Sequence, residues 1–355
     1  MKEKNMDELS VLLISADPQN ATGGIATWTK GYMDYCKNNN INCELVDTAK
    51  ISKYRHNKIL NEIARTKAII NSLYTKIESS PHHFDLAHLN SSIGFYGIIR
   101  DYVLARSIVK KNIPLVLHFH CDIAYWDRGL IKRHFIRKIL RLASKCIVLC
   151  GSSKKHLLNE YGVHSDILPN FFDIKNIHVN KTINDKANVV VYTGRVSKAK
   201  GSIEIFQLAS RFPDKTFIMA GKRYLNIEEY DVPSNVKLLG EKKHQEILDI
   251  LCKADVFLFP SHSEGFSIAL LEAMAEGLPS IVTDVGANRD MVSNGAGIVV
   301  SIGSINEMED ALRRLEPRSI RLEMSNAAYH KVINEYSVEQ VMNQLFYFYS
   351  DLLVN

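Results

Sequence analysis

Short apolar segments recur along nearly the whole chain and alternate with stretches of helical periodicity. Unbroken apolar runs indicate strands buried on both faces, and their alternation with helices is typical of parallel βα units. In the first half, a further helix is expected to begin at about Ile25, in the loop that follows the first strand. The predicted strands there are 9–16, 43–47, 84–90, 114–120 and 145–150, and the predicted helices lie near 57–79, 94–111 and 128–142.

The alternation lapses at residues 173–187, a polar stretch rich in Asn and Lys that we interpret as a linker. It then resumes, and the end of the chain has a helical pattern throughout. We therefore predict two doubly wound, Rossmann-like α/β domains, 1–172 and 188–334, facing each other across a cleft, with a C-terminal helix, 335–355, crossing back to the first domain. The predicted strands of the second domain are 188–195, 216–221, 235–240, 255–261, 279–284 and 297–301.

Composition narrows the class of protein. The 355 residues are 46% hydrophobic and 23% charged, which is typical of globular chains, and the formal net charge of +5 is too small to indicate nucleic-acid binding. Six cysteines occur without a C-x-x-C spacing, and Cys146 and Cys150 flank an apolar strand, which favours buried free thiols in a reducing compartment. The polar N-terminus and the lack of an apolar run of transmembrane length favour a cytoplasmic protein, either soluble or peripheral on the inner face of the cell membrane.

Two of the predicted strand-end loops carry residues suited to phosphate groups. Gly23 and Gly24 stand at a predicted helix start, where backbone N–H groups can approach an anion, although paired glycines in a βα turn also serve simply as a tight turn. The loop T-G-R-V-S-K-A-K-G places Arg195 and Lys200 after a buried strand, and two such cations suit a diphosphate. The alternative is ordinary surface cations, and we interpret Lys198 in this way.

A third loop, S-E-G-F-S-I-A-L-L-E-A, carries two carboxylates, Glu264 and Glu272. We expect a helix to begin near Gly265 and Phe266, so the carboxylates would lie roughly 12 Å apart along it. That is too far for a glycoside-hydrolase acid/base pair at roughly 5 to 9.5 Å. This separation suits two carboxylates that bind hydroxyls at opposite ends of one ligand, while the anionic middle of the ligand lies at the helix start. A nucleotide sugar has this shape. The free amides would be those of Phe266, Ser267 and Ile268.

These residues resemble a known family. E-G-F-x-x-x-x-x-E, A-x-x-x-G-x-P, T-G-R-x-x-x-x-K-G and the early G-G-I together are similar to the motifs of retaining nucleotide-sugar glycosyltransferases of the GT-B fold, glycosyltransferase family 4 (glycosyl transferases group 1). The likeness covers nearly the full chain and is strongest from about 188 to 300. Two departures are A-G-K-R-Y, where many members have A-G-x-G-P, and Ser267, where Gly is frequent. Lys222 in the first departure could contact a diphosphate or face solvent.

The resemblance implies a role for each matching position. Glu264 would bind hydroxyls of the donor sugar and Glu272 those of the ribose, while Arg195 and Lys200 would hold the diphosphate. Implied catalytic residues are His120, Glu264, Arg195 and Lys200, and implied donor-binding residues are Gly23, Gly24, Arg195, Lys200, Gly265, Phe266, Ser267, Ile268 and Glu272.

The segment L-H-F-H-C-D contains two candidates for the histidine that contacts the sugar, His118 and His120. His120 aligns with the family histidine beside the transferring sugar, and we favour it because it stands at the strand's end. His118 faces the same way by strand periodicity and competes for the role, with a core histidine as the alternative. His82, His83 and His88 have no convincing ligand spacing, and we interpret them as loop and strand residues without a metal.

The family's mechanism implies a hexose transferred from a nucleotide diphosphate to an acceptor hydroxyl with retention, by front-face substitution, without metal or other cofactor. The expected donor is a UDP-hexose, because UDP is the commonest carrier. The acceptor would be lipid-linked or belong to a cell-surface polysaccharide, teichoic acid or glycolipid. Two alternatives remain, a nucleotide-sugar epimerase of the same fold and a non-catalytic sugar-binding protein, although neither is marked by the E-G-F-x-x-x-x-x-E pattern or the Arg/Lys pair.

Residues 128–142, R-G-L-I-K-R-H-F-I-R-K-I-L-R-L, predict a basic amphipathic helix. Such a helix can lie on an anionic bilayer, and the alternative is a core-facing helix with a solvated basic face. The predicted apolar face comprises Leu130, Ile131, Phe135, Ile139 and Leu142, and the basic residues are Arg128, Lys132, Arg133, Arg137, Lys138 and Arg141.

Overall fold

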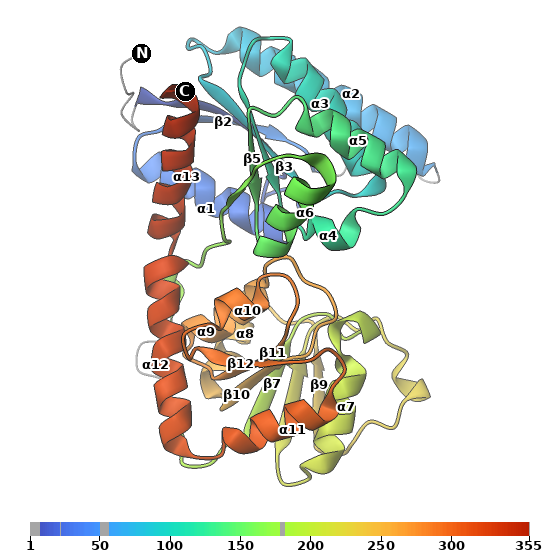
Figure 1. Ribbon diagram of the computed structural model, residues 1–355, viewed down its shortest axis with the longest axis vertical. Helices are drawn as coiled ribbons and strands as arrows, with labels where there is room; N and C mark the ends of the chain where they lie inside the picture. The colour runs from blue at the N-terminus through green and yellow to red at the C-terminus, as the bar shows by residue number, and fades with distance from the viewer. Residues whose placement is uncertain (1–7, 22, 50–56, 178–181, 355) are drawn as a thin grey trace. The chain divides into compact units, whose positions relative to one another are not determined.

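Two parallel six-stranded sheets organise the chain, each within its own compact unit. In the computed structural model, which describes residues 8–21, 23–49, 57–177 and 182–354, unit 1 comprises 1–170 and 338–355, and unit 2 comprises 171–337 (Figure 1). Every pairing between neighbouring strands in the described parts is parallel, as the continuous apolar segments predict. Each unit is therefore an α/β domain of the doubly wound class, and the predicted fold class is confirmed.

Unit 1 has the strand order β2-β1-β3-β4-β5-β6. The order reverses between β1 and β3, so the loops after these two strands meet at the edge where doubly wound sheets bind ligands. The strands are β1 (Ser10–Ser15), β2 (Asn42–Asp47), β3 (Leu86–Ser91), β4 (Leu115–Phe119), β5 (Lys145–Val148) and β6 (Asp166–Ile167), of which the two-residue β6 was not predicted. The helices are α1 (Gly24–Asn38), α2 (Lys58–Ser79), α3 (Phe95–Val109), α4 (Ile123–Trp126), α5 (Leu130–Leu140), α6 (Gly151–Tyr161) and α13 (Val338–Val354).

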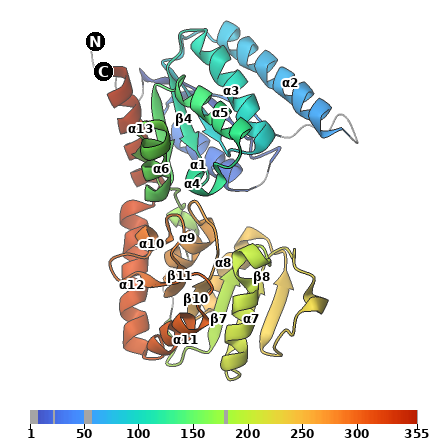
Figure 2. The ribbon, with the colours of Figure 1, turned by 45° about the vertical axis from the view of Figure 1, so that its right-hand side comes forward.

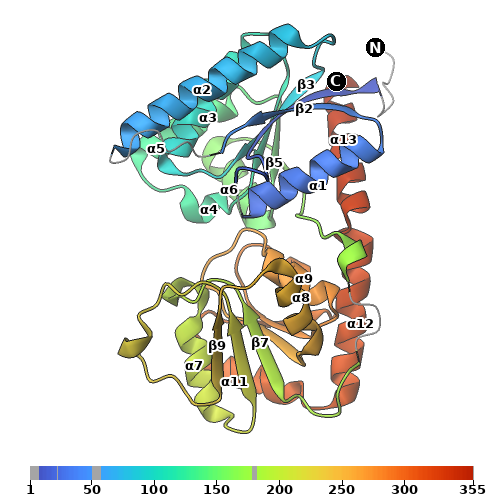
Figure 3. The same cartoon turned by 180° about the vertical axis from the view of Figure 1, so that it is seen from behind.

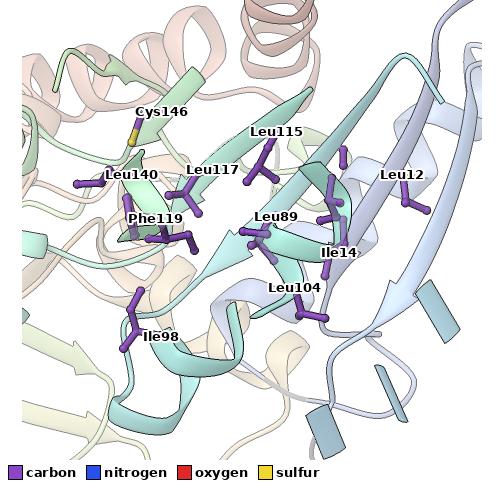
Figure 4. Close-up of a cluster of buried hydrophobic side chains, with 14 of the residues drawn as sticks. Leu12, Ile14, Leu89, Ile98, Leu104, Leu115, Leu117, Phe119, Leu140 and Cys146 are labelled. Carbon is purple, nitrogen blue, oxygen red and sulfur yellow. The ribbon is translucent and has the colours of Figure 1, made fainter. Parts of the chain in front are cut away.

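The two faces of this sheet differ in chemistry. Helices α2, α3 and α5 lie on one face (Figure 3), where the core is almost wholly aliphatic and aromatic (Figure 4). Fourteen residues of that core are drawn in Figure 4, among them Leu12, Leu89 and Leu117 from three adjacent strands. Helices α1 and α13 pack together on the opposite face, so the C-terminal helix packs on the first domain as predicted.

Unit 2 has the strand order β12-β11-β10-β7-β8-β9, which reverses between β7 and β10. Helices α7 and α11 cover one face (Figure 2), and α8 and α9 cover the other, with α12 against α9. The strands are β7 (Val189–Thr193), β8 (Thr216–Ala220), β9 (Val236–Gly240), β10 (Val256–Phe259), β11 (Ser280–Thr283) and β12 (Gly297–Val300). The helices are α7 (Ser202–Arg211), α8 (His244–Lys253), α9 (Ile268–Ala275), α10 (Asn288–Met291), α11 (Ile305–Arg314) and α12 (Arg318–Glu335), with short 3-10 turns η2 (Ile174–Asn176), η3 (Lys198–Lys200) and η4 (Ile227–Glu229).

The predicted linker lies largely outside regular structure. Of residues 173–187, four (178–181) lie outside the described ranges. The described remainder belongs to unit 2, where the Asn184 side chain donates to the Asp255 carboxylate over 2.8 Å. All six cysteines are free, and Cys146 and Cys150 are buried as predicted.

Candidate active site

The reversal of strand order in unit 2 brings two of the predicted phosphate loops together. The T-G-R loop follows β7 and the S-E-G-F loop follows β10, and these strands are neighbours. The backbone N–H of His262 donates to the Ala199 carbonyl over 3.0 Å, which joins the two loops directly. Gly201 lies between them at φ 72°, and a Cβ there would overlap the Pro260 carbonyl oxygen. Only glycine therefore permits this approach of η3 to the end of β10.

Lys200 and Glu264 meet at this junction. The Lys200 ammonium forms an ion pair with the Glu264 carboxylate and donates to the Ser263 carbonyl over 3.3 Å. Both side chains are largely buried, at 15% and 12% exposure, so the pair is shielded from solvent. Two residues that the sequence places on different loops thus share one polar cluster.

Arg195 follows β7 on the same loop, and its position is held through the backbone. The Tyr192 hydroxyl donates to the Arg195 carbonyl over 2.8 Å, whereas the Arg195 guanidinium is exposed and forms no hydrogen bond or ion pair within the described ranges. Lys198 and Lys222, also exposed, lie over the rings of Tyr230 and Tyr224 respectively. Among these cations, Lys200 and Arg195 combine a constrained backbone with proximity to the strand ends.

The helix after the third loop begins later than predicted. Helix α9 starts at Ile268, not near Gly265 and Phe266, because Ser267 is its N-cap and accepts the Leu270 N–H over 3.2 Å. The amides of Phe266 and Ser267 therefore precede the helix, and the Phe266 side chain packs edge-on against Tyr336. The Gly265 carbonyl is occupied, since it accepts the Ala287 N–H over 2.9 Å.

The later start also corrects the spacing of the two carboxylates. Glu264 lies in the loop, so the helical distance of roughly 12 Å between it and Glu272 does not apply. Glu272 lies inside α9, with 12% of its side chain exposed, and burial raises its pKa to about 7. Its carboxylate lies 3.4 Å from Nδ1 of His244, the first residue of α8, a contact that the sequence did not predict.

In unit 1 the glycine pair stands where predicted. Gly23 is the N-cap of α1 with φ 105°, Gly24 is its first residue, and a Cβ at either would meet no atom within 4 Å. The first turn has no acidic side chain, and the Thr27 N–H donates to the carbonyl of the N-cap Gly23 over 3.0 Å. Thr22, which precedes the pair, lies outside the described residues. The geometry therefore leaves an accessible helix N-terminus beside the end of β1.

His118 of β4 and His120, which directly follows this strand, lie together, as periodicity predicts. The ring centroids of His118 and His120 are 4.0 Å apart, and His118 is fully buried with no hydrogen-bond partner for either ring nitrogen among the described residues. His120 is partly exposed, and its Nε2 contacts Asn90 Oδ1 over 2.8 Å. Burial lowers the pKa of His120 to about 3. His88 is buried on β3, while His82 and His83 are exposed loop residues.

No group of three or more His, Cys, Asp or Glu side chains within the described ranges is placed to hold a metal ion. Similarly, none of the helices that these ranges form combines the length and hydropathy needed to cross a bilayer.

The basic helix differs from its prediction. It spans Leu130–Leu140, and its buried residues are Ile136, Ile139 and Leu140, while Leu130 and Ile131 are 88% and 57% exposed. The predicted apolar face is thus divided, because the C-terminal part of the helix is buried in the core and the first turn is exposed to solvent. Four exposed residues, Tyr125, Trp126, Leu130 and Ile131, gather on α4 and the start of α5, and we call them the α4–α5 patch.

Two family models match the chain. Residues 173–331 match "Glycosyl transferases group 1" and residues 49–176 match "Glycosyltransferase Family 4". The chain is 26% identical over 317 residues to an Escherichia coli UDP-Gal:alpha-D-GlcNAc-diphosphoundecaprenol alpha-1,3-galactosyltransferase, covering 80% of this chain and 79% of that protein.

Solved structures share the fold at lower identity. Sucrose-phosphate synthase from Thermosynechococcus elongatus superposes with a TM-score of 0.77 at 15% identity, covering 98% of this chain and all of that one. HepE from Anabaena, solved with UDP-glucose, has a TM-score of 0.72 at 17% identity, covering 97% of this chain and all of that one.

Proposed function

This chain belongs to the family 4 glycosyltransferases of the GT-B fold, and from that premise we propose that it transfers a hexose from a UDP-sugar to an acceptor hydroxyl with retention at the anomeric carbon. The observation that carries the donor assignment is the ion pair of Lys200 with Glu264 at the reversal point of the second sheet, on the same loop as Arg195. A UDP donor is further supported by the relative from Escherichia coli and by the UDP-glucose complex of HepE, each of which names that nucleotide.

In this proposal the cations neutralise the leaving diphosphate. Arg195 has a free guanidinium that can bind two phosphate oxygens, and Lys200 adds a second positive charge. The Ile268 amide at the start of α9 and the amides at Gly23 and Gly24 supply further donors. With the charge of the leaving group balanced in this way, the departing phosphate oxygen takes the acceptor proton on the same face of the sugar. The reaction then requires no metal ion.

The carboxylates would orient the donor. Glu264 would accept hydrogen bonds from hydroxyls of the transferred sugar, and its ion pair with Lys200 would link sugar recognition to diphosphate recognition. Glu272, two turns into α9, would accept from the ribose hydroxyls. His120 would contact the transferred sugar from unit 1. These are the roles that the resemblance to the family implies for the residues of the matching motifs.

A panel of UDP- and GDP-sugars tests the donor assignment. Thermal shift should select one or more UDP-hexoses, and slow hydrolysis in the absence of acceptor should release UDP and an α-configured sugar detectable by NMR. Stabilisation by GDP-sugars alone would contradict the UDP assignment, and a β-configured product would contradict retention. An epimerised nucleotide sugar without UDP release would favour the epimerase alternative.

The acceptor is proposed to be lipid-linked, and the α4–α5 patch supports it. Cationic side chains border the four exposed apolar residues. The Arg128 guanidinium lies 4.8 Å from the Tyr125 ring centroid, and Lys132 Nζ donates to the Trp126 carbonyl over 2.9 Å. An apolar cluster bordered by cations suits the interface of an anionic bilayer. The Escherichia coli relative is named for a diphosphoundecaprenol acceptor, which is a lipid-linked one.

Vesicle co-sedimentation tests this attachment. The protein should sediment with phosphatidylglycerol-containing vesicles more than with phosphatidylcholine alone, and Leu130→Ser with Ile131→Ser should abolish the difference. Leu322→Ser, which changes an exposed leucine of unit 2, is the matched control and should sediment as wild type. Equal sedimentation with both kinds of vesicle would contradict the proposal.

A further inference from the structure

One face of the unit 1 sheet carries polar side chains where the other face carries the aliphatic core. On β3, His88 and Asn90 alternate with Leu89 and share the α1/α13 face. The register sets Asn90 opposite His118 of β4, and β1 on the other side ends at Ser15. Asn90, 4% exposed and on the central strand of the three, can therefore reach both neighbours.

The side chains on this face form one hydrogen-bonded chain. Asn90 Oδ1 lies 3.0 Å from His88 Nε2 and 2.8 Å from His120 Nε2, and Asn90 Nδ2 lies 2.9 Å from Ser15 Oγ. At one end, Tyr349 Oη of α13 lies 2.6 Å from His88 Nδ1. At the other end, Ser15 Oγ lies 2.6 Å from Thr29 Oγ1, which lies 2.8 Å from the Ile25 carbonyl oxygen.

The Ile25 carbonyl fixes the direction of the hydrogen bonds from Thr29 to the two imidazoles. A carbonyl can only accept, so the Thr29 hydroxyl donates to it, and the Ser15 hydroxyl must then donate to Thr29. Ser15 Oγ is left as an acceptor for Asn90, which places Nδ2 toward Ser15 and Oδ1 toward the two imidazoles. Oδ1 cannot donate, so His88 and His120 each carry their proton on Nε2.

We propose that Asn90 is a positioning residue that holds His120 as a neutral ring with its proton on Nε2, so that Nδ1 is a hydrogen-bond acceptor for a hydroxyl of the transferred sugar. This inference rests on the proposed function, since it deepens the role of His120 in that reaction. It specifies the chemistry of the contact: the sugar group that meets Nδ1 must be a donor, which a hydroxyl is and a deoxygenated carbon is not. The backbone of His120 is itself anchored, because its backbone N–H donates to the Ser91 carbonyl over 2.8 Å.

The surroundings favour a neutral ring. Among the described residues, the titratable groups that face His120 are His118 of β4 and His88 of β3, with the phenols of Tyr32 from α1 and Tyr349 from α13 beyond His88. Burial, followed by proximity to His88, lowers the pKa of His120. A neutral imidazole presents one donor and one acceptor, and Asn90 determines which nitrogen has which role.

NMR tests the tautomer without reference to activity. In the full chain labelled with ¹⁵N-histidine, two-bond correlations distinguish a ring protonated on Nε2 from one protonated on Nδ1, and His120→Gln identifies the signal. The proposal expects the Nε2-protonated pattern at pH 7.5. The Nδ1-protonated pattern or an imidazolium would overturn it while leaving the glycosyltransferase assignment standing.

Two near-isosteric variants separate positioning from packing. Asn90→Asp keeps acceptor oxygens toward His120 but adds a charge that raises the histidine pKa, so hydrolysis of UDP-glucose or UDP-galactose should remain within about threefold of wild type at pH 9 and fall toward pH 6. Asn90→Leu removes the acceptor, and kcat/KM should fall about tenfold at every pH, the equivalent of one hydrogen bond.

A packing role predicts the opposite order, because leucine suits a buried site better than a carboxylate does. Wild-type kcat/KM in a folded Asn90→Leu variant, as judged by circular dichroism, would overturn the proposal. If no UDP-sugar of the donor panel is turned over by the wild-type enzyme, the proposed function fails, and the NMR pattern still decides the tautomer.

Discussion

Replacing Glu272 by Gln should change how the stability of the protein depends on pH. The carboxyl group lies within α9 with 12% of its side chain exposed, and burial raises its pKa from 4.5 to about 7. The folded chain therefore holds this proton more tightly than the unfolded chain does. The stabilisation from the protonated group is fully present below pH 4.5 and is lost as the pH rises through 7.

The size of the effect follows from the two pKa values. Their difference, 7 − 4.5, is about 2.5 units, and at about 1.36 kcal/mol per unit the group loses roughly 3 kcal/mol of stabilisation between pH 4.5 and pH 8.5. Glutamine has nearly the same shape and cannot ionise. The free energy of unfolding of Glu272→Gln should therefore rise relative to wild type by up to about 3 kcal/mol across that range.

Urea unfolding at pH 5, 6, 7 and 8.5 measures this difference, because contributions shared by the two proteins cancel. Glu228→Gln, at an exposed carboxylate of the same unit, is the matched control. A pH-independent difference for Glu272→Gln would refute the argument that burial of this carboxyl opposes its ionisation. Donor binding offers a second readout, since UDP affinity should fall about tenfold if this group accepts from the ribose.

Three further results are expected. Arg195→Ala and Lys200→Ala should each lower turnover about 10²- to 10³-fold with an unchanged circular dichroism spectrum, whereas Lys198→Ala should retain wild-type rates; full activity in either of the first two would reject its role. Turnover of the UDP-sugar should persist in EDTA, and restoration by Mn²⁺ or Mg²⁺ of activity lost to the chelator would contradict metal independence. Burial lowers the pKa of His118, so wild type should lose stability as the pH falls below 6.5, and His118→Leu should reduce that loss by about 1.4 kcal/mol per pH unit; identical thermal melts of the two proteins at pH 5.5 and 7.5 would disprove this.

Local patterns were sufficient for every strand except the two-residue β6, and for the loops that follow the predicted strands. Buried parallel strands require unbroken apolar segments, and this requirement is visible in residues such as 188–195 and 255–261 without knowledge of their neighbours. The helix boundaries were less accessible, because they depend on single capping contacts. Ser267 delays the start of α9 by bonding to Leu270, and the first turn of α5 lies outside the core that its later residues enter.

The sequence alone determined the fold class, the position of two strand-end loops in unit 2 and the pairing of His118 with His120 on one face, since each depends on residues close together along the chain. Only the tertiary structure decided which distant groups meet. The reversal between β7 and β10 joins Lys200 to Glu264, and the pairing of β1, β3 and β4 lets Asn90 bond to both His120 and Ser15. Such contacts arise from strand order and register, which the periodicity of a single segment does not contain.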